Sequence, residues 1–155
     1  MVAELKALLE SIGKVPIICG VRPGYIVPRI QALAMNEAAR LVEEGVASAA
    51  EIDKAIKYGF GVRFAVLGML EFIDWGGGDI LYYAGRYLTQ ALGSDRYAPP
   101  EIVAQNMRDG RVGLRTRKGL LDYDNLDIDA YRDDRLRAFV NLLTHFGMMR
   151  PPVLS

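Results

Sequence analysis

The sequence has only one cysteine and one histidine among its 155 residues. The single thiol, Cys19, excludes an internal disulfide framework, and a lone imidazole at His145 leaves no His/Cys cluster for a structural zinc site. The 19 basic side chains balance 19 acidic ones, so the formal net charge is zero. A neutral chain lacks the general electrostatic attraction on which binders of nucleic acids and anionic membranes depend.

Long apolar runs are also absent, since none approaches the roughly 20 residues of a membrane span. The first residues mix acidic and apolar side chains, unlike a secretory signal. Apolar residues make up 51% of the chain and charged residues 25%, which is ordinary for a globular domain. These features predict a cytoplasmic protein in a reducing compartment, with enough residues for one domain to bury its own core.

Residues 1–20 differ in character from the rest. Apolar residues at three- and four-residue steps predict an amphipathic helix over 2–12, and β-branched residues predict a buried strand over 15–19 that ends in a buried structural thiol, Cys19. One helix and one strand cannot form a sheet alone. We therefore interpret residues 1–20 as the last helix and strand of a dinucleotide-binding domain whose body lies upstream, and residues 21–155 as a separate helical domain.

Helical spacing continues from residue 28 to the C-terminus, with no sustained strand and no internal repeat. The expected helices cover 28–44, 49–58, 65–75, 79–92, 100–109 and 127–146. Ser48 and Glu51 have the spacing of a capping box, Asp79 is an expected N-cap, and Asp127 or Asp129 is another. Residues 76–78, three glycines, are better explained as a hinge between helices than as a phosphate-binding turn. The predicted fold class is an all-α bundle.

Few side chains are candidates for acid–base chemistry. His145 falls in the last turn of the final helix, where a cation suits the helix dipole, so a structural role is favoured. Glu71 and Asp74 lie three residues apart and would share one helix face. Such carboxylates can divide acid and base work, or they can cap helices and pair with Arg63 or Arg86, and the structural alternative is favoured.

Basic residues gather in one stretch of the chain, namely Arg108, Arg111, Arg115, Arg117 and Lys118, and acidic residues follow them. A solvated surface with mutual pairing is the favoured interpretation. The alternative is that the guanidinium groups bind the phosphates of a nucleotide or coenzyme. Residues 108–118 contain no aromatic side chain, which counts against nucleic acid as a partner.

Three stretches together resemble the C-terminal domain of the 3-hydroxyacyl-CoA dehydrogenase family. The first is Pro23-Gly-Tyr-Ile-Val-Pro-Arg29 leading into Asn36-Glu-Ala-Ala-Arg-Leu-Val-Glu-Glu-Gly45. The second is Ala50-Glu-Ile-Asp-Lys-Ala-Ile-Lys-Tyr-Gly-Phe-Gly61. The third is Gly113-Leu-Arg-Thr-Arg-Lys-Gly-Leu-Leu-Asp-Tyr123, which is similar to the family's closing G-x-K-T-G-x-G-F-Y-x-Y segment. Each motif is loose alone, but three in the same order are specific.

The resemblance implies a helical bundle like the C-terminal domain of 6-phosphogluconate dehydrogenase, forming the substrate cleft and the homodimer of an NAD-dependent enzyme of fatty-acid metabolism. The family's catalytic histidine and glutamate belong to its dinucleotide-binding half. The resemblance therefore implies that this chain carries no catalytic residue, binds no NAD or metal by itself, and is inactive without that half.

Site residues follow from the same resemblance. Pro28 and Arg29 are expected at the substrate, with Pro28 replacing an asparagine of the family. Arg115 is the expected cofactor contact, in place of a lysine. Arg117 stands where the family has glycine, and Leu120-Leu121 replace Phe-Tyr.

The segment Gly61-Val-Arg-Phe-Ala-Val-Leu-Gly68 resembles the lambda-crystallin/gulonate and carnitine dehydrogenase branch of the family. In that branch Arg63 would meet a substrate carboxylate. Three hypotheses therefore remain open. The leading one is a domain of an acyl-CoA enzyme. The others are part of a dehydrogenase for a small hydroxy acid, and a non-catalytic dimerisation module.

Overall fold

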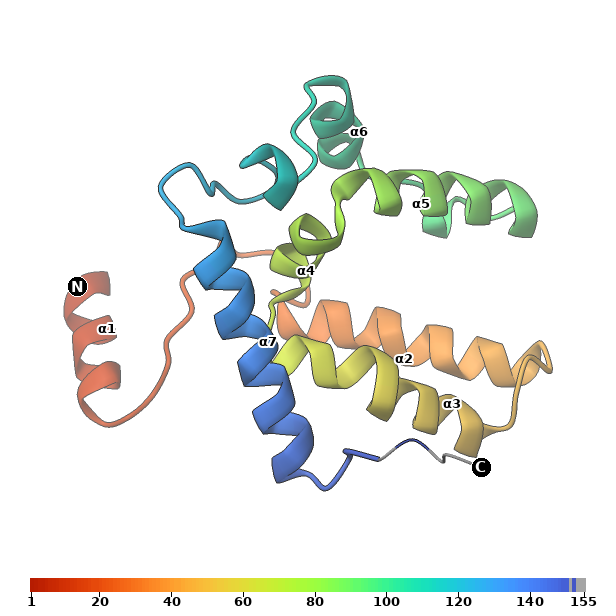
Figure 1. Cartoon of the computed structure of the whole chain (residues 1–155), viewed down its shortest axis with the longest axis horizontal. Coiled ribbons are helices and arrows are strands. Elements are labelled where there is room, and N and C mark those ends of the chain that lie inside the picture. Colours follow the sequence, from red (N-terminus) through yellow and green to blue (C-terminus); the bar gives the residue numbers. More distant parts are fainter. Residues whose placement is uncertain (151, 153–155) are drawn as a thin grey trace. The chain divides into compact units, whose positions relative to one another are not determined.

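The computed structural model describes residues 1–150 and 152, and the chain divides into two compact units at residues 52 and 53. The described residues form α-helices joined by short 3₁₀ and π turns, with two isolated β-bridges and no strand (Figure 1). The predicted all-α fold class is confirmed.

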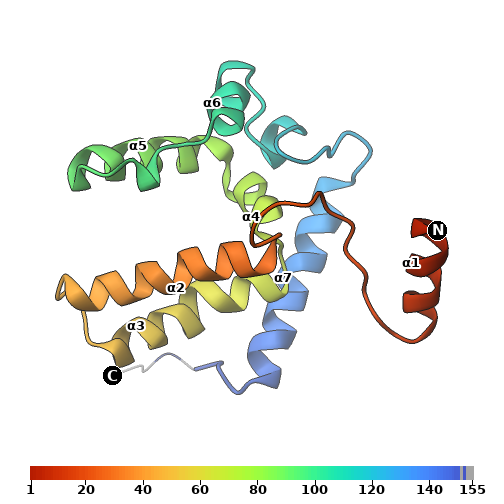
Figure 2. The same cartoon turned by 180° about the vertical axis from the view of Figure 1, so that it is seen from behind.

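The first unit contains α1 (Val2–Ser11), an extended segment, α2 (Val27–Glu43) and the start of α3 (Ala49–Ala55) (Figure 2). Both predicted helices are present within one or two residues of the expected bounds. Pro28 lies in the first turn of α2, where its missing N–H costs no hydrogen bond. Gly45 has φ +69°, a left-handed conformation that ends the helix.

The predicted buried strand over 15–19 is wrong. This segment is extended but unpaired, and Val15 and Ile17 are 85% and 70% exposed. A strand is stable only when its backbone N–H and C=O groups pair with a neighbour, and no other strand exists among the described residues. Cys19 is exposed for the same reason, so the prediction of a buried thiol is also wrong.

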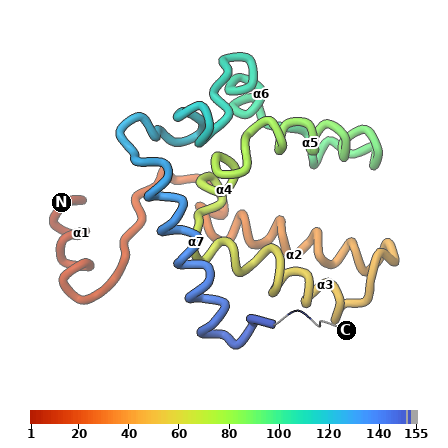
Figure 3. The backbone as a smooth tube through the Cα atoms, viewed as in Figure 1, coloured from red at the N-terminus to blue at the C-terminus, as the bar shows by residue number. Residues whose placement is uncertain are grey.

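The second unit carries the remaining elements, which can be followed along the tube in Figure 3. After α3 they are the π-helix η1 (Ile56–Gly61), the 3₁₀ helix η2 (Val62–Ala65), α4 (Met69–Gly76), α5 (Gly78–Leu92), η3 (Asp95–Tyr97), α6 (Glu101–Arg108), η4 (Leu114–Thr116) and α7 (Ile128–His145).

Local signals account for several helix starts. The Glu51 N–H donates to Ser48 Oγ at 3.3 Å, and Asp127 Oδ1 accepts from the N–H groups of Asp129 and Ala130, both at 3.1 Å. Those caps are confirmed. The expected cap at Asp79 is wrong, because Gly77 is the N-cap of α5.

Two helix bounds were also mispredicted. The helix predicted over 49–58 is α-helical only to Ala55 and then widens into η1, which continues to Gly61. The helix predicted over 65–75 begins at Met69, where Gly68 is the N-cap and its N–H donates to the Glu71 carboxylate at 2.9 Å. The glutamate thus fixes the start of α4.

The core of the second unit lies where α4, α5 and α6 meet the segment 112–123. It buries Leu67, Val103, Leu114 and Tyr123 together with one charged side chain, Asp74. α5 packs against both α4 and α6, and α4 packs against η2 and η4. The most buried part of this unit therefore surrounds the segment that carries the third sequence motif.

Candidate functional site

The motif segment 113–123 is fastened to α4 by the buried carboxylate of Asp74. The backbone N–H groups of Leu120 and Leu121 donate to Asp74 at 2.9 and 2.8 Å, and the Tyr123 hydroxyl donates at 3.2 Å. Asp74 is 2% exposed. A buried carboxylate needs such donors because burial without them costs several kcal/mol, so Asp74 and the segment depend on each other.

Glycines let the segment lie directly on α4. A Cβ at Gly113 would lie 2.3 Å from the Asp74 carbonyl oxygen, and one at Gly119 would lie 2.1 Å from Asp74 Oδ1. Gly113 also has φ +109°, which side chains rarely adopt. The two motif glycines are therefore required by close approach to a single residue.

Arg115, the expected cofactor contact, lies in η4 at the tip of a closed loop. The loop is closed by the Gly113 N–H, which donates to the Lys118 carbonyl at 2.8 Å, and Thr116 Oγ1 accepts from Val112 N–H at 3.0 Å. The Arg115 guanidinium pairs with Asp79 at the start of α5. Its hydrogen bond holds the pKa of the Asp79 carboxyl below the usual range.

Arg117 adopts a left-handed conformation with φ +60° and ψ 0°. Its guanidinium lies within 3.1–3.4 Å of the carbonyl oxygens of Tyr123, Asp124 and Leu126, to which it donates. The family has glycine at this position, according to the resemblance above, and the observed φ explains why glycine suits it. In this chain the arginine side chain holds the backbone of residues 123–126 through these hydrogen bonds.

Glu71 and Asp74 do lie on one helix, as predicted, but each serves a separate tyrosine. The Tyr131 hydroxyl donates to Glu71, and the Tyr123 hydroxyl donates to Asp74. Burial, together with the carboxylate beside each hydroxyl, raises the pKa of both tyrosines. The structural interpretation of this carboxylate pair is the one that the contacts support.

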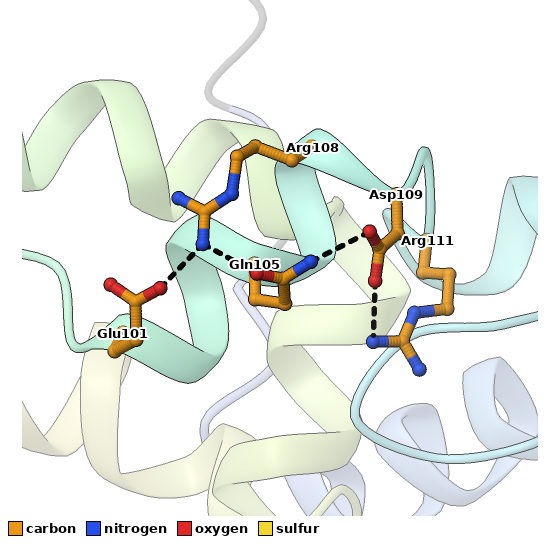
Figure 4. A network of polar contacts seen from close by, with 5 residues as sticks. All are labelled: Glu101, Gln105, Arg108, Asp109 and Arg111. Atoms are coloured by element: carbon orange, nitrogen blue, oxygen red, sulfur yellow. Dashed lines mark hydrogen bonds and ion pairs between the residues drawn. The ribbon is translucent and has the colours of Figure 1, made fainter.

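The basic stretch 108–118 is paired locally. Arg108 contacts Glu101 and Gln105, while Asp109 accepts hydrogen bonds from Gln105 and Arg111 (Figure 4). Lys118 pairs with Asp124 at 2.8 Å. With Arg115 bound to Asp79 and Arg117 bound to carbonyl groups, every cation of the stretch has a partner. The contacts favour a paired surface over a phosphate site.

The other expected substrate residues lie on different elements. Pro28 and Arg29 are exposed at the start of α2 in the first unit, where the Arg29 N–H donates to the Gly24 carbonyl at 3.2 Å. Arg63 is exposed on η2, with its guanidinium 5.5 Å from the Phe72 ring centroid. Within the second unit Arg63 and Arg115 have separate partners, so the structure does not bring them together.

His145 is exposed in the last turn of α7, with its ring 5.3 Å from that of Phe146. This position agrees with the structural role expected at a helix C-terminus. Groups of three or more His, Cys, Asp or Glu side chains able to hold a metal ion are absent from the described residues.

The glycines at 76–78 do not form a phosphate cradle. The N–H groups of Gly77 and Gly78 donate to the carbonyls of Ile73 and Val112 at 2.8 and 2.9 Å, so they are not available to a phosphate. The Asp79 carboxylate, which stands beside them, would also repel one. These glycines lie where α4 ends and α5 begins, as the hinge interpretation expects.

Sequence reasoning missed two contributors to this region, Asp79 and Tyr131. Asp79 was assigned to a helix cap, whereas its partner Arg115 lies in a distant motif. Tyr131 follows no motif, and only packing brings it to Glu71, 60 positions away. Local spacing carried no signal for either contact.

Comparisons with known proteins define the class. Residues 24–123 match the 3-hydroxyacyl-CoA dehydrogenase, C-terminal domain. A 3-hydroxyacyl-CoA dehydrogenase structure from Archaeoglobus fulgidus aligns with a TM-score of 0.79 and 31% identity, covering 96% of this chain and 50% of that one. These are oxidoreductases. The chain belongs to the 3-hydroxyacyl-CoA dehydrogenase family through its helical C-terminal domain.

The names of two curated relatives give different substrates. A 3-hydroxybutyryl-CoA dehydrogenase from Clostridioides difficile is 32% identical over 76% of this chain and 41% of its own. A 5-formyl-3-hydroxy-2-methylpyridine 4-carboxylate 5-dehydrogenase from Mesorhizobium japonicum is 28% identical over 90% of this chain and 45% of its own. The chain thus spans less than half the length of these relatives. None of the helices in its described part is long and apolar enough to cross a membrane.

Proposed function

We propose that the chain is the substrate-cleft and dimerisation domain of an NAD-dependent 3-hydroxyacyl-CoA dehydrogenase, which oxidises L-3-hydroxyacyl-CoA to 3-ketoacyl-CoA. The family match over residues 24–123 is the observation that carries this proposal. In it, NAD and the catalytic histidine and glutamate belong to a dinucleotide-binding domain, and this chain contributes binding and positioning.

Exposed apolar surface supports the need for such a partner domain. In α1, Val2, Leu5 and Leu8 are 62%, 56% and 60% exposed although they follow a helical stripe. Contiguous apolar surface of this kind is normally covered by another domain or subunit. The proposal therefore assigns residues 1–20 to the edge of the dinucleotide-binding domain.

A dehydrogenase for a small hydroxy acid is the second candidate. Arg63 is exposed and its guanidinium has no carboxylate partner among the described residues, so it is available to a substrate carboxylate. The Mesorhizobium japonicum relative, named for a pyridine carboxylate, supports this alternative.

A chimera tests both candidates. The N-terminal half of the Archaeoglobus fulgidus relative is fused ahead of this chain, and NADH consumption is followed with acetoacetyl-CoA and with acetoacetate. Activity on acetoacetyl-CoA, absent from either half alone, supports the leading proposal. A preference for acetoacetate that Arg63→Met abolishes, and that the surface control Arg132→Met leaves intact, supports the second.

The same experiment can overturn both. A folded, dimeric chimera that binds NADH but reduces neither compound would identify a non-catalytic dimerisation module. Pro28→Asn in the chimera then tests whether activity is missing only because Pro28 lacks the side-chain donor of the family's asparagine. Activity regained in that variant would retain the enzyme assignment.

A further inference from the structure

A wide apolar groove lies in the second unit between η1, η2 and the C-terminal end of α7. Its volume is about 500 Å³, and its walls include Ile56, Val62, Ala65, Leu142, Phe146 and Met148. Binding sites for small organic molecules have volumes of about 300–1,000 Å³ and mostly apolar walls. The groove has both properties and is built from segments more than 75 positions apart in the chain.

The wall supplied by η1 has an unusual backbone. Residues 56–61 form a π-helix, a rare conformation that is frequently found at functional sites. Gly61 allows it, since a Cβ there would lie 3.1 Å from the carbonyl oxygen of Ile56. The π turn places Ile56, Lys57, Tyr58 and Gly61 along the same groove. A rare backbone conformation therefore forms one wall of this groove.

Two cationic side chains stand at the groove. Lys57 lines it, and Arg150 lies beside it, where its guanidinium donates to the Tyr58 hydroxyl at 3.5 Å and stands 5.5 Å from the Tyr58 ring centroid. Neither cation has a carboxylate partner among the described residues, in contrast to the paired cations of the stretch 108–118. Two unpaired cations beside an apolar wall suit a ligand with one anionic end.

Two other cavities of the described residues lack this combination. A cavity of about 510 Å³ along α5 is lined by polar side chains, among them Tyr83, Arg86 and Gln90. Another of about 250 Å³, near Phe72 and Ile80, has no polar side chain at all. The groove at η1, unlike these two, joins a large apolar volume to a positive rim.

We propose that this groove binds a straight-chain carboxylate, a free fatty acid, with its chain against η1 and α7 and its carboxylate at Lys57 and Arg150. Met148 suits such a ligand because its flexible thioether adapts to chains of different length. The proposal is independent of the enzyme assignment, since it concerns binding by this chain alone.

The test is a titration of the whole chain with carboxylates from butyrate to dodecanoate, below their micelle concentrations, by calorimetry. Each added methylene should tighten binding about fourfold until the groove is filled. The Met148 methyl resonance should shift on binding. Ala65→Trp, which fills the groove, should abolish binding. The double variant Lys57→Gln/Arg150→Gln should weaken carboxylate binding roughly fivefold and leave binding of the matching alcohol unchanged. Arg132→Gln is the surface control.

Three results would overturn the proposal. The first is affinity that does not depend on chain length, and the second is full binding by a folded Ala65→Trp variant. The third is a groove that is closed by a second copy of the chain, which Ala65→Trp would reveal by dissociating a dimer in sedimentation. None of these results bears on whether the chimera described above is active, so the two proposals fail separately.

Discussion

The carboxylate of Asp74 accepts the backbone N–H of Leu121 at 2.8 Å, although 47 positions separate the two residues. The same carboxylate binds the neighbouring N–H of Leu120 and the hydroxyl of Tyr123. One buried side chain on α4 thereby holds the motif segment that carries Arg115. Stability and site geometry thus depend on the same contacts.

Asp74→Ala should lower the free energy of unfolding by roughly 3–5 kcal/mol, because it leaves two backbone N–H groups and a hydroxyl without a buried acceptor. Urea unfolding followed by circular dichroism measures the change. The matched control is Asp133→Ala on the exposed side of α7, expected within about 0.5 kcal/mol of the parent chain. Equal losses in the two variants would contradict the anchoring role of Asp74.

Gly119→Ala should destabilise the chain by about 2–3 kcal/mol, since the new Cβ would lie 2.1 Å from Asp74 Oδ1 and force the segment off α4. Gly76→Ala is the control, because nothing lies within 4 Å of its added Cβ and its φ is ordinary. That variant should be stabilised by about 0.5–1 kcal/mol through the unfolded chain. Thermal unfolding of both variants distinguishes close contact from a general effect of losing glycine.

The helices could be predicted from the sequence because their signals are local. Apolar spacing, the Asp127 cap and the glycine after α2 all act within a few residues. The unpaired state of residues 15–19 could not, because whether such a segment forms a strand depends on partners elsewhere in the protein. The π turn at 56–61 was also missed, since nothing in its spacing distinguishes it from a continued α-helix.

The candidate site was harder to predict than the fold. The motif 113–123 could be recognised from its residue types, yet its anchor on Asp74 could not, because those hydrogen bonds join residues 46 to 49 positions apart. The carboxylate pair Glu71 and Asp74 could be identified by its spacing. Its actual partners, two tyrosines, depend on the packing of α7 and of the motif segment against α4.

Two substitutions at Arg117 distinguish the effect of its backbone conformation on stability from the effect of its side chain. Both Arg117→Ala and Arg117→Gly remove the guanidinium that donates to three carbonyl groups, but only glycine relieves the left-handed conformation at φ +60°. The glycine variant should therefore be about 0.5–1 kcal/mol more stable than the alanine variant. Equilibrium unfolding of the two variants in urea measures this difference. An alanine variant as stable as the glycine variant would show that the conformation carries no cost.

The pKa of Tyr123 gives a pH dependence with a definite sign. Burial, followed by the nearby Asp74 carboxylate, raises the pKa of this hydroxyl in the folded chain above its usual value of about 10. At a pH between the pKa of the unfolded chain and that of the folded chain, the folded state holds a proton that the unfolded state has released. The contribution of Tyr123 to the free energy of unfolding is complete below about pH 10 and declines as the pH rises toward the folded-state pKa. In Tyr123→Phe, the free energy of unfolding should be lower at neutral pH by about 1 kcal/mol and should fall less steeply above pH 10. Urea titrations across this range measure both slopes, with the exposed Tyr87→Phe as control, and parallel slopes in all three proteins would contradict the prediction.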